Sequence, residues 1–176
     1  DALTWNFRGC SDEINRQLRF YHSGATDDLE TVIRHALAKG IYQHISLIGF
    51  SLGGNLTLKY LGERGGSVLS AIKSAVTFSV PMDLHTGCLK ISTPANWLYA
   101  QRFLKSLKAK VRAKSGKMKG LNVSGIDKIN TLLEFDNRYT APIHGFRDAI
   151  HYYHECSSVN YVQKIQIPTL IVNAKN

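Results

Sequence analysis

The segment from residue 45 to residue 66 constrains the fold more strongly than any other part of the chain. It begins with a short apolar run, residues 45–50, of the kind that forms a buried strand. After Ser51 the apolar residues recur at the spacing of one helix face, at Leu52, Leu56 and Tyr60. Glycines at positions 65 and 66 then end the helical pattern. The segment therefore predicts a strand, a tight turn that carries Ser51, and a helix.

The turn itself has the composition of a nucleophile elbow. Residues 49–53 read Gly-Phe-Ser-Leu-Gly, which is a G-x-S-x-G pattern. Such a turn strains the serine backbone, and side chains two residues before and after it would collide, so Gly49 and Gly53 are expected to remove those collisions. The hydroxyl of Ser51 would then project from the sheet, and the backbone N–H of Leu52 would face a developing oxyanion. We predict Ser51 as a catalytic nucleophile and the Leu52 N–H as an oxyanion donor.

Further patterns continue the alternation of strands and helices. Thr26 or Asp27 is predicted to cap a helix over residues 28–39, and Gly40 follows its end. Apolar runs predict additional strands at residues 2–6, 71–80 and 167–173. Strands that alternate with helices indicate an α/β fold, with a parallel sheet flanked by helices and right-handed crossovers.

Three polar residues follow predicted strand ends. Arg8, Ser51 and Asp83 each come directly or shortly after a strand, and functional sites in parallel sheets lie at the carboxyl ends of the strands. We therefore expect the three residues to share one rim of the sheet. Asp83 is an alternative candidate for the acid of a catalytic triad, and its other interpretation is a local cap or ion pair.

The stretch between Asp83 and Gln166 is much longer than one crossover requires. It is rich in aromatic and basic residues, and we expect it to form a mostly helical cap over the active rim. The predicted organisation is thus a core over residues 1–83, a cap insertion over 84–166, and a returning core strand over 167–176. In the cap, a basic helix is expected to place Phe103, Leu107 and Val111 inward and its lysines outward.

Composition limits the class of protein. The chain of 176 residues is long enough for one domain with a core, and it contains neither a membrane-spanning apolar run nor a signal peptide. Cys10, Cys88 and Cys156 are an odd number without metal-ligand spacing, which favours reduced thiols in a cytoplasmic compartment. We expect no metal and no cofactor.

The positive charge is concentrated in one segment. Residues 102–119 hold eight of the 22 Lys and Arg residues, against a net charge of +9 for the whole chain, and no acid lies between Asp83 and Asp127. The segment is either the solvated face of a surface helix or a contact for anionic lipid at a membrane surface. Nucleic acid is not an expected partner, because the block lacks interleaved aromatic residues and any known nucleic-acid-binding module.

Several short stretches together resemble one family. They are Asn-Phe-Arg-Gly-Cys-Ser at 6–11, Tyr-His-Ser-Gly at 21–24, Gly-Phe-Ser-Leu-Gly-Gly-Asn at 49–55, Val-Pro-Met-Asp-Leu at 80–84, Thr-Ala-Pro-Ile-His-Gly-Phe at 140–146 and Ile-Pro-Thr-Leu-Ile-Val-Asn at 167–173. In this combination the chain resembles the YheT/EMB8-like α/β-hydrolases, which include the ABHD1/2/3-type lipid esterases. The resemblance covers essentially the whole chain. One departure is His151, where the family usually has an acid.

The resemblance implies a partial α/β-hydrolase fold and a serine hydrolase of carboxylic esters, which acts through an acyl-Ser51 intermediate on a small-molecule ester or lipid. It also implies that the triad Asp and His lie beyond Asn176, so that this segment alone would be nearly inactive. The alternatives are an acyltransferase or thioesterase of the same fold, and a non-catalytic, membrane-associated homologue. The expected location is cytoplasmic, with membrane association left open.

The remaining candidates are expected to be structural. His144, His151 and His154 fall within the predicted cap, so each is expected to have a surface or packing role rather than to act as general base. His22 precedes the nucleophile, which is the wrong order for a triad in this fold.

Overall fold

The computed structural model describes residues 1–11 and 13–175, and these form two compact units. One unit, called here the sheet unit, contains the described residues of 22–84 and 153–175. The other, called here the helical unit, contains those of 1–11, 13–21 and 85–152. No helix in the described part of the chain is both long and apolar enough to span a bilayer.

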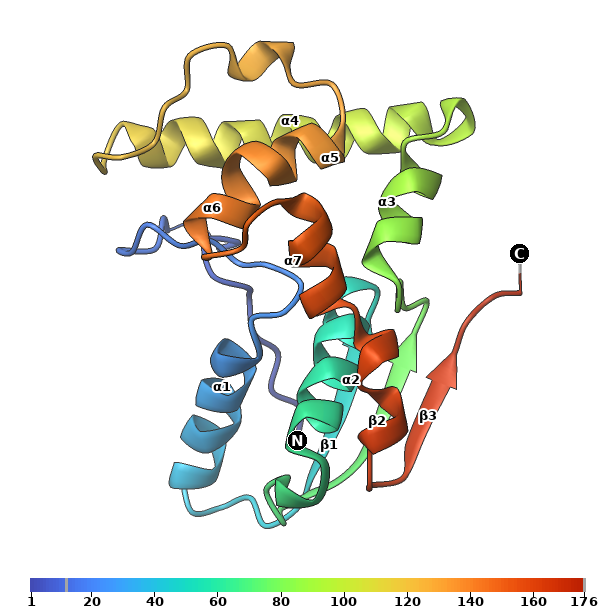
Figure 1. Ribbon diagram of the computed structural model, residues 1–176. Helices are drawn as coiled ribbons and strands as arrows, with labels where there is room; N and C mark the ends of the chain where they lie inside the picture. The colour runs from blue at the N-terminus through green and yellow to red at the C-terminus, as the bar shows by residue number, and fades with distance from the viewer. Residues whose placement is uncertain (12, 176) are drawn as a thin grey trace. The chain divides into compact units, whose positions relative to one another are not determined.

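A parallel three-stranded sheet forms the centre of the sheet unit (Figure 1). Its strands are β1 (Ile45–Phe50), β2 (Ile72–Phe78) and β3 (Thr169–Val172), in the order β1-β2-β3. Phe50 is opposite Phe78, and Phe78 is opposite Val172, so the carboxyl ends of the three strands are aligned. The predicted α/β class with a parallel sheet flanked by helices is confirmed.

Two helices complete the sheet unit. Helix α2 (Leu52–Arg64) follows β1 directly, and α1 (Thr26–Ala38) packs beside it. The apolar side chains of α2 are almost wholly buried, and they form the core with the inward residues of β1, β2 and α1: Leu56, Leu58, Tyr60 and Leu61 with Leu47, Ala75, Leu29 and Ile33. The short 3-10 turns are η1 (Gly65–Ser67), η5 (Ser158–Asn160) and η6 (Val162–Lys164).

The start of α1 differs from the prediction. The helix begins at Thr26, with Ala25 as the N-cap, and neither Thr26 nor Asp27 caps it. The Thr26 hydroxyl instead donates a hydrogen bond to the Glu63 carboxylate of α2 at 2.8 Å. A tertiary partner has therefore replaced the local capping contact. Gly40 follows the helix with a φ of +72°, as expected for a helix end.

The helical unit contains a series of helices with connecting turns. These are α3 (Leu84–Ile91), η2 (Pro94–Asn96), α4 (Trp97–Ser115), η3 (Ile126–Lys128), α5 (Leu132–Phe135), the π-helical turn η4 (Asp136–Thr140), α6 (Ala141–Ile143) and the first half of α7 (Ala149–Cys156). The prediction that residues 84–166 are mostly helical is confirmed. The domain boundaries and the role of this segment as a cap over the active rim stay predictions.

The long helix α4 places two of the three predicted residues inward, since Val111 is buried and the partly buried Leu107 packs against the same cluster. Leu104 and Val111 are 1 % exposed and pack with Ile126, Ile129, Phe135 and Tyr139. Phe103 is 41 % exposed, so its predicted inward position is wrong. It lies one residue off the buried stripe, and its ring packs edge-on against Tyr99 with 4.7 Å between centroids.

Lys114 contradicts the prediction that the lysines of α4 point outward. It is 1 % exposed. Its ammonium donates to the Asn15 side-chain oxygen at 2.6 Å and to the carbonyls of Gln17 and Arg19 at 2.8 and 2.9 Å. It also lies 3.9 Å from the centroid of the Phe20 ring. These oxygen acceptors and the aromatic ring replace water, and they explain why a cation is tolerated inside the helical unit.

The predicted strand at residues 2–6 is not formed. These residues have no regular secondary structure, and they belong to the helical unit. The Trp5 ring packs edge-on against Phe7, and Phe7 stacks on Tyr21. Ring packing, rather than pairing with a neighbouring strand, therefore orders this segment. Arg8 consequently does not follow a strand, and its side chain donates to Gln17 at 3.1 Å.

Candidate active site

Ser51 occupies a strained turn between β1 and α2. Its φ is +50° and its ψ is −117°, a conformation that residues other than glycine rarely adopt. Its N–H donates to the Phe78 carbonyl of β2 at 2.9 Å, and its carbonyl accepts the Asn55 N–H of α2 at 3.1 Å. The side chain is exposed. The predicted strand–turn–helix with strained geometry at Ser51 is confirmed.

The close contact between β1 and α2 explains the first glycine of the motif. A Cβ atom on Gly49 would lie 2.7 Å from both the Gly53 carbonyl oxygen and the Gly54 Cα, which are separations that real Cβ atoms do not show. The obstacle is backbone, so no side-chain rotation can relieve it. Glycine at position 49 is therefore a steric requirement of the turn.

The second glycine of the motif is not required in the same way. A Cβ atom on Gly53 would meet nothing within 4 Å, so the collision predicted at this position is wrong. The next residue has the steric role instead, because a Cβ on Gly54 would lie 2.5 Å from the Val80 side chain. Gly54 lies where α2 crosses the end of β2, and that crossing could not be seen from the motif alone.

The first turn of α2 can stabilise negative charge. Leu52 is the first residue of the helix, and the first N–H groups of a helix have no carbonyl acceptor within it. The dipole of this 13-residue helix adds partial positive charge at the same end. An anion beside Ser51 would therefore meet backbone donors. The assignment of the Leu52 N–H as an oxyanion donor stays a prediction.

The rim beside Ser51 includes the residues that follow β2 and β3. The Ser79 N–H donates to the Val172 carbonyl at 2.8 Å, and Ser79 has a φ of +52°. The Asn173 side chain donates to the Val80 carbonyl and accepts the Val80 N–H, both at 2.8 Å. These bonds extend the pairing of β2 and β3 toward the loop that carries Asp83. The assignment of Asp83 as a triad acid stays a prediction.

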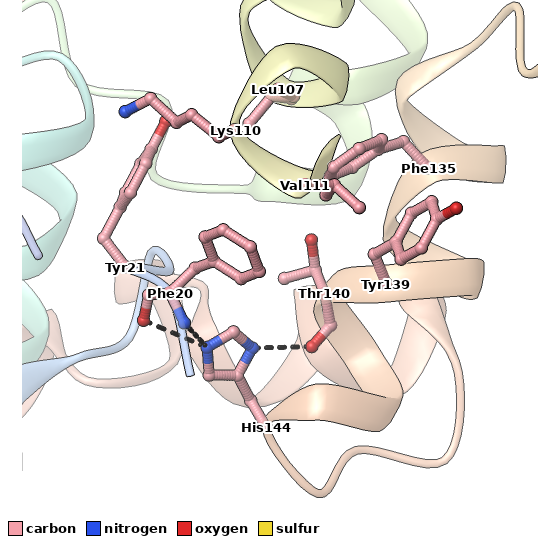
Figure 2. A pocket seen from close by; sticks show the side chains of 9 residues that line it. All are labelled: Phe20, Tyr21, Leu107, Lys110, Val111, Phe135, Tyr139, Thr140 and His144. Carbon is pink, nitrogen blue, oxygen red and sulfur yellow. Dashed lines mark hydrogen bonds between the residues drawn. The ribbon is translucent and has the colours of Figure 1, made fainter. Parts of the chain in front are cut away.

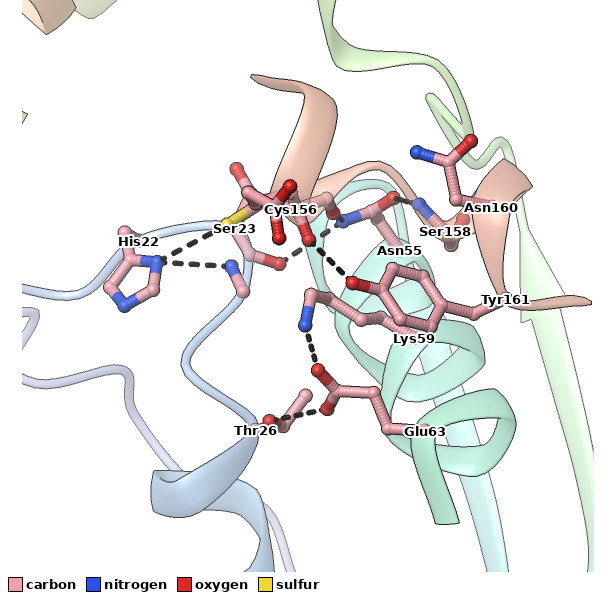
Figure 3. A network of polar contacts seen from close by, with 12 residues as sticks. His22, Ser23, Thr26, Asn55, Lys59, Glu63, Cys156, Ser158, Asn160 and Tyr161 are labelled. Carbon is pink, nitrogen blue, oxygen red and sulfur yellow. Dashed lines mark hydrogen bonds and ion pairs between the residues drawn. The ribbon is translucent and has the colours of Figure 1, made fainter. Parts of the chain in front are cut away.

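Asn55 is a structural residue of the site that the sequence analysis missed. Its side chain is wholly buried on α2, one turn after Ser51, and it makes three bonds to two separate stretches of backbone (Figure 3). The amide nitrogen donates to the Ser23 carbonyl at 3.1 Å and to the Cys156 carbonyl at 2.9 Å, and the amide oxygen accepts the Ser158 N–H at 2.9 Å. The sequence did offer a signal, because Asn55 is a polar residue within the apolar face of the predicted helix.

The segment around Ser158 also contacts the loop after β2. The Leu84 N–H donates to the Ser157 hydroxyl at 2.9 Å, and the Val159 N–H donates to the Met82 carbonyl at 3.1 Å. Through these bonds and those of Asn55, one segment joins the elbow helix to the loop that contains Asp83.

A second, partly buried network lies further along α2. Lys59 forms an ion pair with Glu63, which also accepts the Thr26 hydroxyl, and the Lys59 ammonium lies 4.6 Å from the centroid of the Tyr161 ring (Figure 3). Burial raises the pKa of the nearby Cys156 thiol to about 12. That thiol therefore remains protonated at neutral pH, which argues against a second nucleophile here.

The four histidines lie in packed or surface positions, and the expectation that none of them acts as general base stays a prediction. In the helical unit, the His144 ring contacts the Thr140 carbonyl at 2.7 Å and accepts the Phe20 N–H at 3.1 Å, beside a cavity of about 20 Å³ (Figure 2). Burial lowers the pKa of His144.

The other histidines make local contacts. His151 accepts the Arg147 N–H at 3.2 Å, and the side chain of His154 is 73 % exposed beside Glu155. In the sheet unit, His22 accepts the Gly24 N–H at 3.2 Å.

The chain is similar to known hydrolases along nearly its whole length. It is 34 % identical over 178 residues to the putative esterase YheT of Escherichia coli K12, which covers 99 % of the chain and 52 % of YheT. It is 31 % identical over 174 residues to the phospholipase ABHD3 of Bos taurus, covering 98 % of the chain and 42 % of that protein. Against the monoacylglycerol lipase of Saccharomyces cerevisiae the identity is 28 % over 184 residues, covering 100 % of the chain and 40 % of the lipase.

The chain thus spans about half the length of the curated relatives it matches, or less. No protein-family model and no solved structure matches it. The similarity to YheT and ABHD3 agrees with the parallel sheet and with the strained serine at its edge. The chain belongs to the YheT/ABHD-like α/β-hydrolases.

Proposed function

We propose that the protein is a serine hydrolase of carboxylic esters. The observation that carries the proposal is the exposed Ser51 in a strained turn between β1 and α2. Its Oγ would attack the ester carbonyl carbon while its proton passes to a general base. The alcohol would then leave with a proton, and water would hydrolyse the acyl-Ser51 ester to release the acid.

The first turn of α2 supports this chemistry. Attack on the carbonyl places negative charge on its oxygen, and the Leu52 N–H, at the start of the helix, would donate to that oxyanion. A backbone donor is held by the helix and needs no reorganisation as the charge develops. This makes the helix start suited to an acyl-transfer transition state rather than to the neutral ester.

The base and the acid that complete the triad are part of the proposal. We place both in the gene product beyond Asn176, with Asp83 as the alternative acid. Residues 84–166 are proposed to act as a helical cap over the edge from which Ser51 emerges. The substrate class is an acyl ester or lipid, which the names of the esterase, phospholipase and lipase relatives support.

The test uses the full-length gene product and short and medium p-nitrophenyl esters. Ser51→Ala is expected to lower turnover by several orders of magnitude, because a triad loses most of its activity with its nucleophile. Ser79→Ala is the matched control, since Ser79 is an exposed serine with a similar positive φ at the end of the neighbouring strand. A fluorophosphonate probe should add to Ser51 in the intact protein. Full activity of Ser51→Ala would overturn the proposal.

A second pair of measurements tests where the triad is completed. Residues 1–176 alone should be nearly inactive, because loss of the base costs on the order of a millionfold in turnover. Asp83→Asn in the full-length protein should keep most of the activity. Comparable turnover by the short chain, together with loss of activity in Asp83→Asn, would instead make Asp83 the acid.

Acyl transfer to an alcohol or hydrolysis of a thioester would use the same acyl-Ser51 intermediate, so product analysis separates these reactions from ester hydrolysis. Competing alcohols should leave free acid as the main product of a hydrolase. A full-length protein without turnover and without fluorophosphonate labelling would be a non-catalytic homologue.

A further inference from the structure

The first turns of α4 expose a group of large apolar side chains. Trp97 is 57 %, Leu98 77 %, Tyr99 55 % and Phe103 41 % exposed, and these four residues are called here the α4 tip. The Tyr99 and Phe103 rings pack against each other, so part of the tip is already ordered. Successive residues of a helix point in different directions, so exposure at three consecutive positions means that the helix start is open on several sides.

Positive charge continues from the tip along the same helix. Leu98, Arg102 and Lys105 follow one another at spacings of four and three residues, so they form one exposed row. The helix contains no acidic residue over Trp97–Ser115, and the carboxylate of Asp127 pairs with Arg112 near the other end of α4. The charge next to the tip is therefore not neutralised by an acid of its own helix.

Exposed aromatic and aliphatic side chains beside cations match the chemistry of one partner in particular. Trp and Tyr favour the boundary between lipid headgroups and acyl chains, Leu favours the acyl region, and Lys and Arg are attracted to anionic headgroups. A nucleic acid would satisfy the cations but would leave Leu98 without an apolar environment. A second protein copy would have to accept the cations of the same row.

We infer that the α4 tip, with Arg102 and Lys105, docks on an anionic lipid bilayer. Trp97 and Leu98 enter the interfacial layer, and the two cations contact the headgroups. This surface would bring the enzyme to esters that reside in a membrane. The inference extends the proposed action on lipid esters, but the docking itself needs no catalysis, so it can be tested without turnover.

The test measures binding of the full-length Ser51→Ala protein to vesicles by sedimentation, so that no lipid is consumed. Vesicles of phosphatidylcholine are compared with vesicles of phosphatidylcholine and phosphatidylserine. Binding to the anionic vesicles should exceed binding to the neutral ones. Trp97→Ser with Leu98→Ser should lower the partition coefficient by tenfold or more. Arg102→Gln or Lys105→Gln alone should lower it about fivefold each.

Matched controls come from the sheet unit. Ile41 is 69 % exposed, and Ile41→Ser removes an equally accessible aliphatic side chain. Lys39→Gln and Lys73→Gln remove the same charge from exposed positions outside α4. These variants should bind as the parent does. Because all substituted side chains are exposed, circular dichroism should show unchanged folding, and the charge variants remain informative if the apolar double variant does not fold.

Several results would overturn the inference. They are equal binding by the tip variants and the controls, equal binding to neutral and anionic vesicles, binding to an RNA oligonucleotide but to no vesicle, and a dimer that the tip substitutions dissociate without any binding to lipid. Loss of esterase activity in Ser51→Ala, or its absence from the parent, bears on the proposed function and leaves the vesicle result unaffected.

Discussion

The side-chain oxygen of Asn55 accepts the Ser158 N–H at 2.9 Å, across 103 positions of the chain. The same side chain donates to the Ser23 and Cys156 carbonyls, so one amide joins the elbow helix to segments on both sides of it in sequence. Its three bonds are made where no water competes, since the residue is wholly buried. Asn55 thus holds α2, the helix that begins beside Ser51, to both segments through hydrogen bonds.

Replacing Asn55 tests how much its hydrogen bonds contribute to stability. Asn55→Leu keeps most of the volume but removes the hydrogen bonds to two carbonyls and one N–H, so we expect the free energy of unfolding to fall by about 3 kcal/mol or more. Urea denaturation measures the change. Asn160→Leu is the matched control, because that exposed amide makes one bond, to the His154 carbonyl. Equal losses in the two variants would contradict the assignment.

The two glycines of the elbow should differ in their tolerance of a methyl group. Gly49→Ala forces Cβ against the backbone of Gly53 and Gly54, and it should lower the unfolding free energy by roughly 2 kcal/mol or more. Gly53→Ala meets open space inside a helix, where alanine is favoured over glycine, so it should be neutral or stabilising by up to about 1 kcal/mol. Thermal denaturation measures the stability of both variants. A larger loss in Gly53→Ala than in Gly49→Ala would contradict the geometry of the turn.

Lys114 should be essential for the order of the segment before Phe20. Lys114→Met retains the unbranched chain but removes the donors from Asn15, Gln17 and Arg19. We expect a loss of stability of about 1–3 kcal/mol, together with faster amide exchange at residues 15–19, because three oxygen acceptors lose a charged donor. Lys117→Met substitutes a lysine whose side chain is exposed, so it serves as the control and should change neither quantity.

His144 should make stability depend on pH. Burial lowers its pKa in the folded protein below the ordinary value of 6.5, despite opposing hydrogen bonds from the backbone at Thr140 and Phe20. The unfolded chain therefore binds more protons as the pH falls through 6.5, and its extra protonation favours unfolding. The contribution of His144 to the free energy of unfolding is complete above pH 6.5, and it is lost as the pH falls toward the lowered pKa of the folded state.

The measurement compares the unfolding free energy at pH 7.5 and pH 5.5, two conditions chosen about one unit on each side of the ordinary histidine pKa. The parent should lose stability at the lower pH, and His144→Gln should lose less. His154→Gln removes a histidine whose side chain is 73 % exposed, and it should retain the slope of the parent. An unchanged slope in His144→Gln would show that other groups cause the dependence.

The sequence alone determined the elements whose causes are local. The apolar run of β1, the helical spacing of α2 and the glycine at position 49 lie within one short stretch, so the strained serine could be predicted without knowledge of the rest of the fold. The parallel sheet followed from the alternation of strands and helices, because crossovers of that kind allow few other arrangements.

The tertiary structure decided which polar groups became buried and what they contact. Asn55 has partners 32, 101 and 103 positions away, and Lys114 has partners 97 and 95 positions before it at Gln17 and Arg19. Residues 2–6 have strand-like composition but no strand, because a strand exists only when another segment pairs with it. Hydrophobic periodicity reports which face of a helix is apolar. It does not report which distant backbone groups require a hydrogen-bond partner inside the core. Asn55 and Lys114 supply such partners, and this explains why these polar residues are buried.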